Sequence, residues 1–532
     1  MKKHLGLLIL LLAAIFLYTF NLGDLTLRDW DESIVATVAR EIYRATPSEL
    51  VWLYPQSING SPYWNKPPLI HNLIALSYQI FGVSEWSTRL VPALCGAMCV
   101  PLLFLIGQEI FPTKKEAYFS AGVYLTLIPV VRHNRLAMLD GAITFCFCLG
   151  VWCLLKLKKK DDLPKSLSFL HQQLFSFLVG LSFAGICLSK GIAIALLLGL
   201  ILVGYALADR SDFLALAVPR NLICMAIGFS LVPIWYGLQY SHYGSTFLSY
   251  NLGTQAFSRI TTSVENNSQP WWFYLIELLK YGLPWLIFLP GGLILAIRQR
   301  KKSWAKLAII WFTTYLSVIS IMNTKLPWYI VPLYPALSLI VGAKLSQLVQ
   351  RRSKLRYRSY QISFAILAII FWLAFVYLCW WYHPRDLDLI LIALCLALTL
   401  TLTAIFFRHK STYVVYCLVG GLYLTLLVFV NSQHSIWELS EADPVKPIAQ
   451  LIDSTIPPQN LSVYSSYPYY RPSLDFYSNH LVIPLAEVDL KAILENKKSV
   501  YFLISKDHLL IDNTRAIAEN SDWQILVKDA IN

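Results

Sequence analysis

Charged side chains that could carry chemistry stand in short polar stretches between long apolar runs of this 532-residue chain. The stretches contain Asp29, Asp31, Glu32, Lys66, Arg135, Asp140, Lys190, Arg259, Lys325 and Tyr329. Arginine and lysine at such places can bind a phosphate, arginine through bidentate contacts and lysine as a point charge. Carboxylates can orient or deprotonate a hydroxyl group as a general base. These residue types together indicate chemistry on an anionic ligand.

Long apolar runs must position these residues. The chain is 56% hydrophobic and 14% charged, whereas soluble domains average about a quarter charged residues. Apolar runs of roughly 18 residues can cross a bilayer as helices, and in lipid the backbone has to satisfy its own hydrogen bonds. Runs such as 5–22, 362–381 and 389–407 therefore predict an all-α polytopic membrane protein.

Basic clusters between the runs predict the orientation. We expect about thirteen spans, at residues 5–22, 90–111, 117–131, 141–156, 174–189, 191–208, 221–240, 273–297, 305–321, 328–346, 362–382, 388–407 and 413–431. With the N-terminus in the cytoplasm, most basic clusters fall on the cytoplasmic side, including those at Lys159, Arg300 and Arg352, as the positive-inside rule requires. The net charge of +13 then reflects orientation and not nucleic-acid binding.

Two segments lie outside these spans. The apolar run 69–81 is short for a span, so we expect an interfacial or re-entrant helix within a long first outer loop, residues 23–89. From residue 432 strand-like and helix-like stretches alternate in a soluble composition, which predicts a small extracytoplasmic α/β domain over 432–532. Its expected strands are 461–464, 500–504 and 523–527, and its expected helices are 445–452 and 485–494. Residues 1–431 then form the transmembrane domain.

Several cations on the outer side run against the positive-inside trend. Lys190 and Lys325 stand at span boundaries, where a charge is costly without a partner. One boundary lysine is more often a snorkelling residue than a ligand, and outer Trp and Tyr residues more often form an interfacial belt. Several such cations with carboxylates on the same loops favour an anionic lipid headgroup. A polyprenyl phosphate fits, because it joins a phosphate to an apolar tail.

An ordered set of motifs along residues 1–345 resembles the polyprenyl-phosphate-sugar glycosyltransferases of the GT-C superfamily. The similarity is greatest to the bacterial aminoarabinose transferases of lipid A, and protein O-mannosyltransferases are more distant. The motifs are Trp30-Asp31-Glu32, Lys66-Pro67-Pro68-Leu69, Ser87-Thr88-Arg89, Arg135 to Asp140, Leu188-Ser189-Lys190-Gly191 and Lys325-Leu326-Pro327-Trp328-Tyr329. Each motif is weak by itself, and their common order is what carries the resemblance.

The resemblance implies that Asp31 is the essential outer-loop acid and that Lys66, Lys190 and Lys325 line the lipid-phosphate pocket. We further expect the lipid phosphate or the sugar to be bound by Arg259, Tyr329, Glu32 and Arg135. Asp140 is a second candidate catalytic acid, which would assist Asp31 or pair with Arg135, the pairing being favoured.

Two departures from the family pattern matter. The aminoarabinose transferases usually have an arginine where this chain has Ile34, and a glutamate where it has Asn65. That glutamate helps to hold a metal in those relatives. We therefore assign no metal ligand or cofactor here, although a divalent metal stays open, and a lipid A acceptor is less firmly implied.

The expected reaction transfers a sugar from a polyprenyl-phosphate donor to a cell-envelope acceptor, a glycolipid or a protein, outside the bacterial inner membrane. The lysines and Arg259 would stabilise charge on the leaving phosphate, and a single displacement would invert the anomeric centre. A secondary transporter is an alternative, but we find no internal repeat. A polymerase or ligase of envelope glycans that uses a polyprenyl diphosphate is another.

Overall fold

The computed structural model describes residues 2–29, 31–157, 165–208, 217–258, 268–351, 354–409, 411–436, 445–458, 462–487, 499–507 and 514–529. The chain divides into two compact units. The helical unit contains Met1–Asn21, Asn65–Leu69 and Pro92–Ile436. The loop–tail unit contains Leu22–Trp64, Ile70–Val91 and Trp437–Asn532. The C-terminal tail therefore forms one compact unit with the first loop. The sequence instead predicted that this loop belongs to the transmembrane domain, with a boundary at residue 432.

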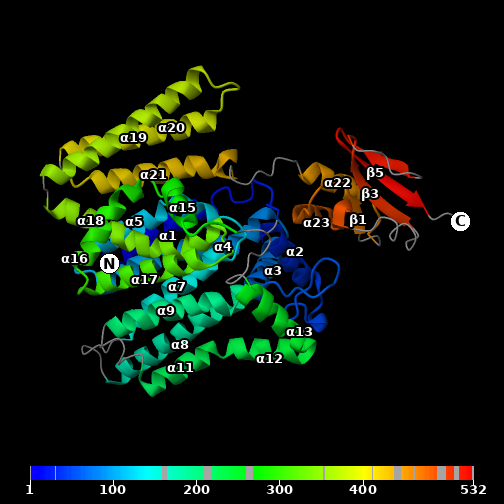
Figure 1. The fold of residues 1–532 in the computed structure, drawn as a ribbon, viewed down its shortest axis with the longest axis horizontal. Helices are drawn as coiled ribbons and strands as arrows, with labels where there is room; N and C mark the ends of the chain where they lie inside the picture. Colours follow the sequence, from blue (N-terminus) through cyan, green and yellow to red (C-terminus); the bar gives the residue numbers. More distant parts are fainter. Residues whose placement is uncertain are drawn as a thin grey trace. The chain divides into compact units, whose positions relative to one another are not determined.

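Apolar helices make up the helical unit (Figure 1). They are α1 (Lys2–Thr19), α4 (Glu85–Ile110), which begins in the loop–tail unit, α5 (Lys114–Leu125), α6 (Ile128–Asn134), α7 (Asp140–Lys156), α8 (Lys165–Lys190), α9 (Ile192–Ala208), α11 (Pro219–Phe229), α12 (Leu231–Tyr243), α13 (Ser245–Leu248), α15 (Phe273–Tyr281), α16 (Leu289–Arg298), α17 (Ser303–Ile321), α18 (Tyr334–Arg351), α19 (Lys354–Trp380), α20 (Leu387–Arg408) and α21 (Val414–Val430). Shorter helical turns are η2 (Ser249–Phe257), η3 (Trp285–Phe288), η4 (Pro327–Leu333) and η5 (Gln433–Ile436). The chain is thus a polytopic α-helical membrane protein that carries a small α/β domain.

The structure does not confirm the expected number of about thirteen spans. Among the described residues, 6 helices are long and apolar enough to cross a membrane, or up to 8 if each of two bent pairs is one span. Four shorter apolar helices accompany them. The predicted span 117–131 is instead divided between α5 and α6, and Pro129 stands in the first turn of α6. A proline there is compatible with a helix start, because its missing N–H has no partner in the first turn.

Two further predicted spans are bent. The run 273–297 forms α15 and then η3 with α16, at an angle of 112°. The break contains Gly282 and Pro284, and proline removes one helical hydrogen bond and clashes with the preceding turn. The run 221–240 is bent by 42° between α11 and α12. Composition alone does not reveal these breaks, because the residues on both sides are apolar.

The C-terminal part of the loop–tail unit is a five-stranded sheet in the order β2-β1-β3-β5-β4. The strands are β1 (Ser462–Ser465), β2 (Leu481–Pro484), β3 (Ser499–Ser505), β4 (Arg515–Glu519) and β5 (Trp523–Asp529). β1 pairs in parallel with β2 and β3, whereas β5 is antiparallel to β3 and β4. Helices α22 (Val445–Thr455) and α23 (Pro472–Ser478) and the turn η6 (Leu485–Glu487) complete it.

Helices α22 and α23 cover one face of this sheet. Ile448 and Ile452 of α22 and Leu474 of α23 share a core with Val463 and Leu503 of the strands. The predicted helix 445–452 and strands 461–464, 500–504 and 523–527 are confirmed within a residue or a few. The predicted helix 485–494 begins as η6, and its remainder lies outside the described residues. The sequence did not predict α23, β2 or β4.

Three elements of the first loop belong to the same unit. They are α2 (Asp31–Arg44), the turn η1 (Pro47–Glu49) and α3 (Leu69–Phe81). Helix α3 has the predicted bounds, and its placement at the membrane interface stays a prediction. Asp29, which precedes α2, accepts hydrogen bonds from Arg471 Nε at 2.9 Å and from the Ser473 backbone N–H at 2.9 Å. This buried contact ties the first loop to the start of α23 in the tail.

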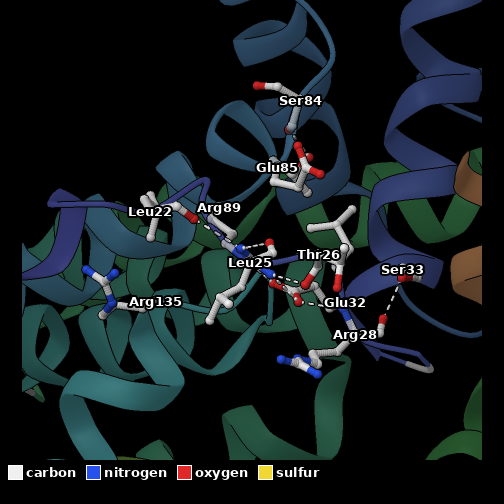
Figure 2. A network of polar contacts seen from close by, with 12 residues as sticks. Leu22, Leu25, Thr26, Arg28, Glu32, Ser33, Ser84, Glu85, Arg89 and Arg135 are labelled. Carbon is white, nitrogen blue, oxygen red and sulfur yellow. Dashed lines mark hydrogen bonds and ion pairs between the residues drawn. The ribbon is translucent and has the colours of Figure 1, made fainter. Parts of the chain in front are cut away.

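A second buried network fixes the start of α2 (Figure 2). Arg89 Nε donates to Glu32 Oε1 at 2.7 Å, and its Nη2 donates to Oε2 at 2.9 Å. The Arg28 backbone N–H donates to Glu32 Oε2 at 2.8 Å. Arg89 also donates to the carbonyls of Leu22, Leu25 and Thr26. A bidentate guanidinium–carboxylate pair with these extra acceptors offsets the cost of burying both charges.

Replacing Arg471 with methionine should destabilise the loop–tail unit. The change keeps most of the side-chain volume but leaves the Asp29 carboxylate buried without its cation. Breaking a buried ion pair from one side costs about 3–5 kcal/mol. We expect the full-length Arg471→Met protein in nanodiscs to lose protease resistance in residues 437–532 at a lower temperature than the wild type. Arg515→Met, exposed on β4, is the matched control, and equal resistance of the two variants would contradict the assignment.

The composition of the loop–tail unit also constrains topology, because segments of one compact unit must lie on the same side of the membrane. We expect cysteines introduced as Asn59→Cys and Ser521→Cys to react with an impermeant thiol reagent from the outer side of intact cells. Lys301→Cys, in the basic connection after α16, should react only after the membrane is opened. All three sites are exposed. Labelling of Asn59→Cys and Ser521→Cys from opposite sides would refute this topology.

Candidate functional site

Lys190 and Asp140 form an ion pair inside the helical unit. Lys190 Nζ donates to Asp140 Oδ1 at 2.7 Å, and the two side chains are only 10% and 5% exposed. The same ammonium group lies 4.9 Å from the centroid of the Tyr329 ring, within the range of a cation–π contact. Three predicted residues from distant parts of the sequence therefore meet at one place.

The local sequence explains this meeting. Lys190 is the last residue of α8, and Gly191 follows with a φ of +100°, a backbone conformation that glycine adopts without a steric penalty. The helix can therefore end there, and α9 can begin at Ile192. Asp140 stands in the first turn of α7, where the helix dipole favours a negative charge. A helix end thus presents each partner of the ion pair.

Helix α17 and its neighbour α15 hold the segment that carries Tyr329. Tyr315 Oη donates to the Tyr329 carbonyl at 3.0 Å, and Trp311 Nε1 donates to the Pro332 carbonyl at 3.0 Å. Tyr274 Oη of α15 donates to the Leu326 carbonyl at 3.2 Å. These bonds satisfy carbonyl groups of η4 and the residue before it, which would otherwise be costly to bury. They also fix the ring of Tyr329 against Lys190.

Lys66 reaches the same region from the first loop. Its Nζ donates to Gln255 Oε1 at 3.3 Å, and Gln255 Nε2 lies 3.4 Å from Tyr250 Oη. Tyr250 Oη in turn donates to Asn65 Oδ1 at 2.5 Å. Pro67 and Pro68 follow Lys66 and precede α3, and prolines restrict the backbone at a helix start. Lys66 is thereby positioned by both its backbone and its partner Gln255.

A pocket joins these side chains within the helical unit. Its cavity has a volume of about 40 Å³ and is partly open to the outside, and its lining includes Lys66, Lys190 and Tyr329. The amides Asn65, Asn251 and Gln255 also line it, together with apolar side chains such as Ile192, Ile194 and Leu252. One part of the pocket is thus cationic and polar, and another part is apolar.

Lys325 is buried, but it is not one of the lining residues. It is 5% exposed, and its Nζ donates to the carbonyl of Met322, which does line the pocket. Burial lowers the pKa of Lys325. The structure therefore gives Lys325 a role in holding the loop before η4, and its predicted contact with the lipid phosphate stays a prediction.

Asp31 differs from its acidic neighbours in exposure. Asp29 and Glu32 are 6% and 2% exposed and engage Arg471 and Arg89, whereas Asp31 is only partly buried as the first residue of α2. The two buried acids act as structural anchors on either side of it. Of the three acids, Asp31 is the most accessible to a ligand.

The other predicted residues have different outcomes. Arg135 donates to the carbonyls of Leu17, Tyr18 and Asn21, and so stabilises the C-terminal end of α1. The favoured pairing of Asp140 with Arg135 is wrong, because Asp140 pairs with Lys190. Glu32, predicted to bind substrate, is instead buried against Arg89. Arg259 lies outside the described residues.

The residues at the family's metal position do not fit a divalent metal. Asn65 is neutral, and its Oδ1 already accepts a short hydrogen bond from Tyr250. Among the described residues, no three His, Cys, Asp or Glu side chains gather in a way that could hold a metal ion. Hard divalent ions prefer several carboxylate or carbonyl oxygens, and the amides of this pocket offer oxygens that already accept hydrogen bonds.

The sequence did not single out Tyr250, Asn251 or Gln255. They belong to η2, a stretch of π-helix, and π-helical turns occur frequently at functional sites. A run of polar side chains following the apolar residues of α12 was the only available signal. Polar residues in a connection are so common that this signal has little weight.

Known proteins are similar to this chain in sequence and in fold. A family model described as dolichyl-phosphate-mannose-protein mannosyltransferase matches residues 65–236. An undecaprenyl phosphate-alpha-4-amino-4-deoxy-L-arabinose arabinosyl transferase of Pseudomonas fluorescens is 25% identical over 345 residues, 65% of this chain and 60% of that protein. The corresponding transferase of Aeromonas hydrophila is 23% identical over 342 residues, 63% of this chain and 59% of its own length. The matched region thus spans less than two thirds of either relative.

The structural similarity extends over nearly the whole chain. The crystal structure of ArnT from Cupriavidus metallidurans bound to undecaprenyl phosphate aligns with a TM-score of 0.78, covering 98% of this chain and 97% of ArnT at 19% identity. The apo state of the same protein aligns with a TM-score of 0.77. The chain therefore has the fold of ArnT and resembles, in sequence, the GT-C glycosyltransferases that use polyprenyl-phosphate-linked sugars.

Proposed function

We propose that the chain is a glycosyltransferase that moves a sugar from a polyprenyl-phosphate donor to a cell-envelope acceptor on the outer side of the bacterial inner membrane. The acceptor is a glycolipid, such as a lipid A-like molecule, or a protein. The donor class agrees with the names of the relatives, whose substrate is an undecaprenyl phosphate sugar. The acceptor rests on the sequence resemblance.

The observation that carries this proposal is the composition of the pocket. Lys66 and Lys190 supply ammonium groups, while Ile192, Ile194 and Leu252 supply apolar surface in the same cavity. A polyprenyl phosphate needs both, because its phosphate requires cations and its tail requires apolar contacts. A soluble sugar nucleotide would not use the apolar part.

The proposed chemistry assigns separate tasks to the lysines and the acids. Lys66 and Lys190 bind the donor phosphate and stabilise the charge that grows on it as the glycosidic bond breaks. Asp140 orients Lys190 through the 2.7 Å contact, and Tyr329 limits the movement of the same ammonium group. Asp31 acts as general base toward the acceptor hydroxyl. A single displacement inverts the anomeric centre, and the polyprenyl phosphate leaves.

Removing either lysine should weaken donor binding. We expect Lys66→Ala and Lys190→Ala each to raise the Kd for undecaprenyl phosphate by about 10- to 150-fold, because one charge-assisted hydrogen bond contributes about 1.5–3 kcal/mol. The measurement is titration of the purified full-length protein in nanodiscs. Lys301→Ala, exposed after α16, is the control and should bind like the wild type. Wild-type binding by both pocket variants would refute the assigned phosphate site.

Asp31→Asn should lower turnover without lowering the thermal stability of the protein. Asparagine has the shape of aspartate without its basicity, so we expect turnover to fall at least about 100-fold while the thermal stability and donor binding stay near wild type. Asp29→Asn and Glu32→Gln should instead lower the thermal stability, because each weakens a buried ion pair. Turnover and melting temperature are measured on the same three preparations. An Asp31→Asn protein with wild-type turnover would remove this residue from the mechanism.

A further inference from the structure

Lys66 belongs to a closed ring of side-chain hydrogen bonds. Its Nζ donates to Gln255 Oε1 at 3.3 Å, Gln255 Nε2 donates to Tyr250 Oη at 3.4 Å, and Tyr250 Oη donates to Asn65 Oδ1 at 2.5 Å. Asn65 directly precedes Lys66 in sequence, so the backbone between them closes the ring. All four residues belong to the helical unit. The ring therefore joins the segment that carries Lys66 to the π-helical turn η2.

The π-helical geometry of η2 makes this ring possible. In an α-helix, residues five positions apart point about 140° away from each other, because one turn contains 3.6 residues. A π-helical turn is wider, with hydrogen bonds between residues five positions apart, and this brings such side chains toward one face. Tyr250 and Gln255 stand five positions apart in η2, and their side chains are hydrogen-bonded to each other. The wider turn thus lets both side chains serve the same lysine.

Helix α12 fixes the same turn through a second tyrosine. Tyr236 Oη donates to Asn251 Oδ1 at 2.8 Å. The ring of Tyr236 packs against the rings of Trp235 and Phe247, with centroids 5.0 and 5.9 Å away. An aromatic cluster therefore holds the hydroxyl group that anchors η2. The turn that carries Gln255 is tied both to α12 and to the segment of Lys66.

A lysine gains from such support when it binds a phosphate. Its ammonium group lies at the end of a flexible four-carbon chain, and immobilising such a chain when a ligand arrives lowers the affinity. This loss is smaller when the protein holds the ammonium group in place beforehand. Asp140 and Tyr329 hold Lys190 in this way. Gln255 and Tyr250 stand in the corresponding relation to Lys66.

We propose that Gln255 and Tyr250 are positioning residues, which hold the ammonium group of Lys66 where it meets the donor phosphate. This inference rests on the proposed function, because it presumes that Lys66 binds the phosphate. Gln255 acts on Lys66 directly, and Tyr250 acts by holding Gln255 and Asn65. Tyr250 is not among the described lining residues of the pocket, so its hydroxyl group affects donor binding through the ring and not by contact with the ligand.

Double-mutant cycles with Lys66→Ala test the proposal on the full-length protein in nanodiscs, with undecaprenyl phosphate as the ligand. We expect Gln255→Ala and Tyr250→Phe each to raise the Kd about 3- to 10-fold, the effect of about one hydrogen bond, with the melting temperature near wild type. In the Lys66→Ala background, the same changes should leave the Kd within about twofold of that of Lys66→Ala alone, because their effect passes through the missing ammonium group.

A matched control isolates the loss of one tyrosine hydroxyl group. Tyr240 of α12 is 53% exposed, and Tyr240→Phe makes the same chemical change as Tyr250→Phe. We expect Tyr240→Phe to bind undecaprenyl phosphate like its parent, both with and without Lys66.

The outcomes distinguish this inference from the proposed function. If Lys66→Ala weakens binding but Gln255→Ala or Tyr250→Phe binds like the wild type, the positioning role of that residue is refuted and the proposed function stands. If the two changes weaken binding equally with and without Lys66, they act on the ligand or on the fold of the pocket, and the inference is again wrong. If Lys66→Ala itself binds like the wild type, the phosphate site assigned to Lys66 falls and the inference falls with it.

Discussion

The ion pair between Lys190 and Asp140 is the constraint on which the rest of the helical unit depends. Both side chains are almost fully buried among apolar helices, where an unpaired charge costs several kcal/mol. The pair is therefore formed only if the end of α8 and the start of α7 meet closely, which determines how these helices pack. The ring of Tyr329, on η4, contacts the ammonium group of Lys190 from a third element. The pocket forms where α7, α8 and η4 meet around the buried ammonium group of Lys190.

In the loop–tail unit, buried ion pairs fix the backbone on both sides of Asp31. The residue that precedes Asp31 by two positions and the residue that follows it by one are both buried acids, each held by an arginine from another segment. Arg89 binds Glu32 through its Nε and Nη2 atoms, and Arg471 connects the tail to Asp29. The backbone on both sides of Asp31 is thereby fixed, while its own carboxylate stays partly accessible. Through this arrangement the C-terminal tail supplies Asp29 with buried partners, Arg471 and Ser473.

The sequence predicted what depends on composition and local pattern. The helical character of the membrane part, the bounds of the helix at 69–81 and three strands of the tail followed from hydropathy, length and alternation. Lys66 and Lys190 could be grouped because cations in loops predicted to lie on the outer side contradict the positive-inside trend, and Tyr329 because it belongs to a motif of the resembled family. The break at Gly282 and Pro284 was missed, because the apolar residues around it made the run look continuous.

Contacts between distant segments could not be predicted. Arg135 was favoured as the partner of Asp140, but it donates to carbonyls at the end of α1. Lys190 is fifty positions away and reaches Asp140 because two helices pack side by side. The amides of η2 were missed for a related reason, since only the fold brings them beside Lys66. Pairing in three dimensions decides which charges remain for a ligand, and one sequence carries little information about it.

The central claim is that Lys66 and Lys190 share one lipid phosphate. The most direct measurement is an experimental structure of the full-length protein with undecaprenyl phosphate in nanodiscs. We predict density for the phosphate within about 4 Å of the Nζ atoms of both Lys66 and Lys190, the range of a direct ion pair, with the prenyl chain along Ile192, Ile194 and Leu252. A phosphate bound elsewhere, with the pocket filled by another molecule or by solvent, would contradict the account.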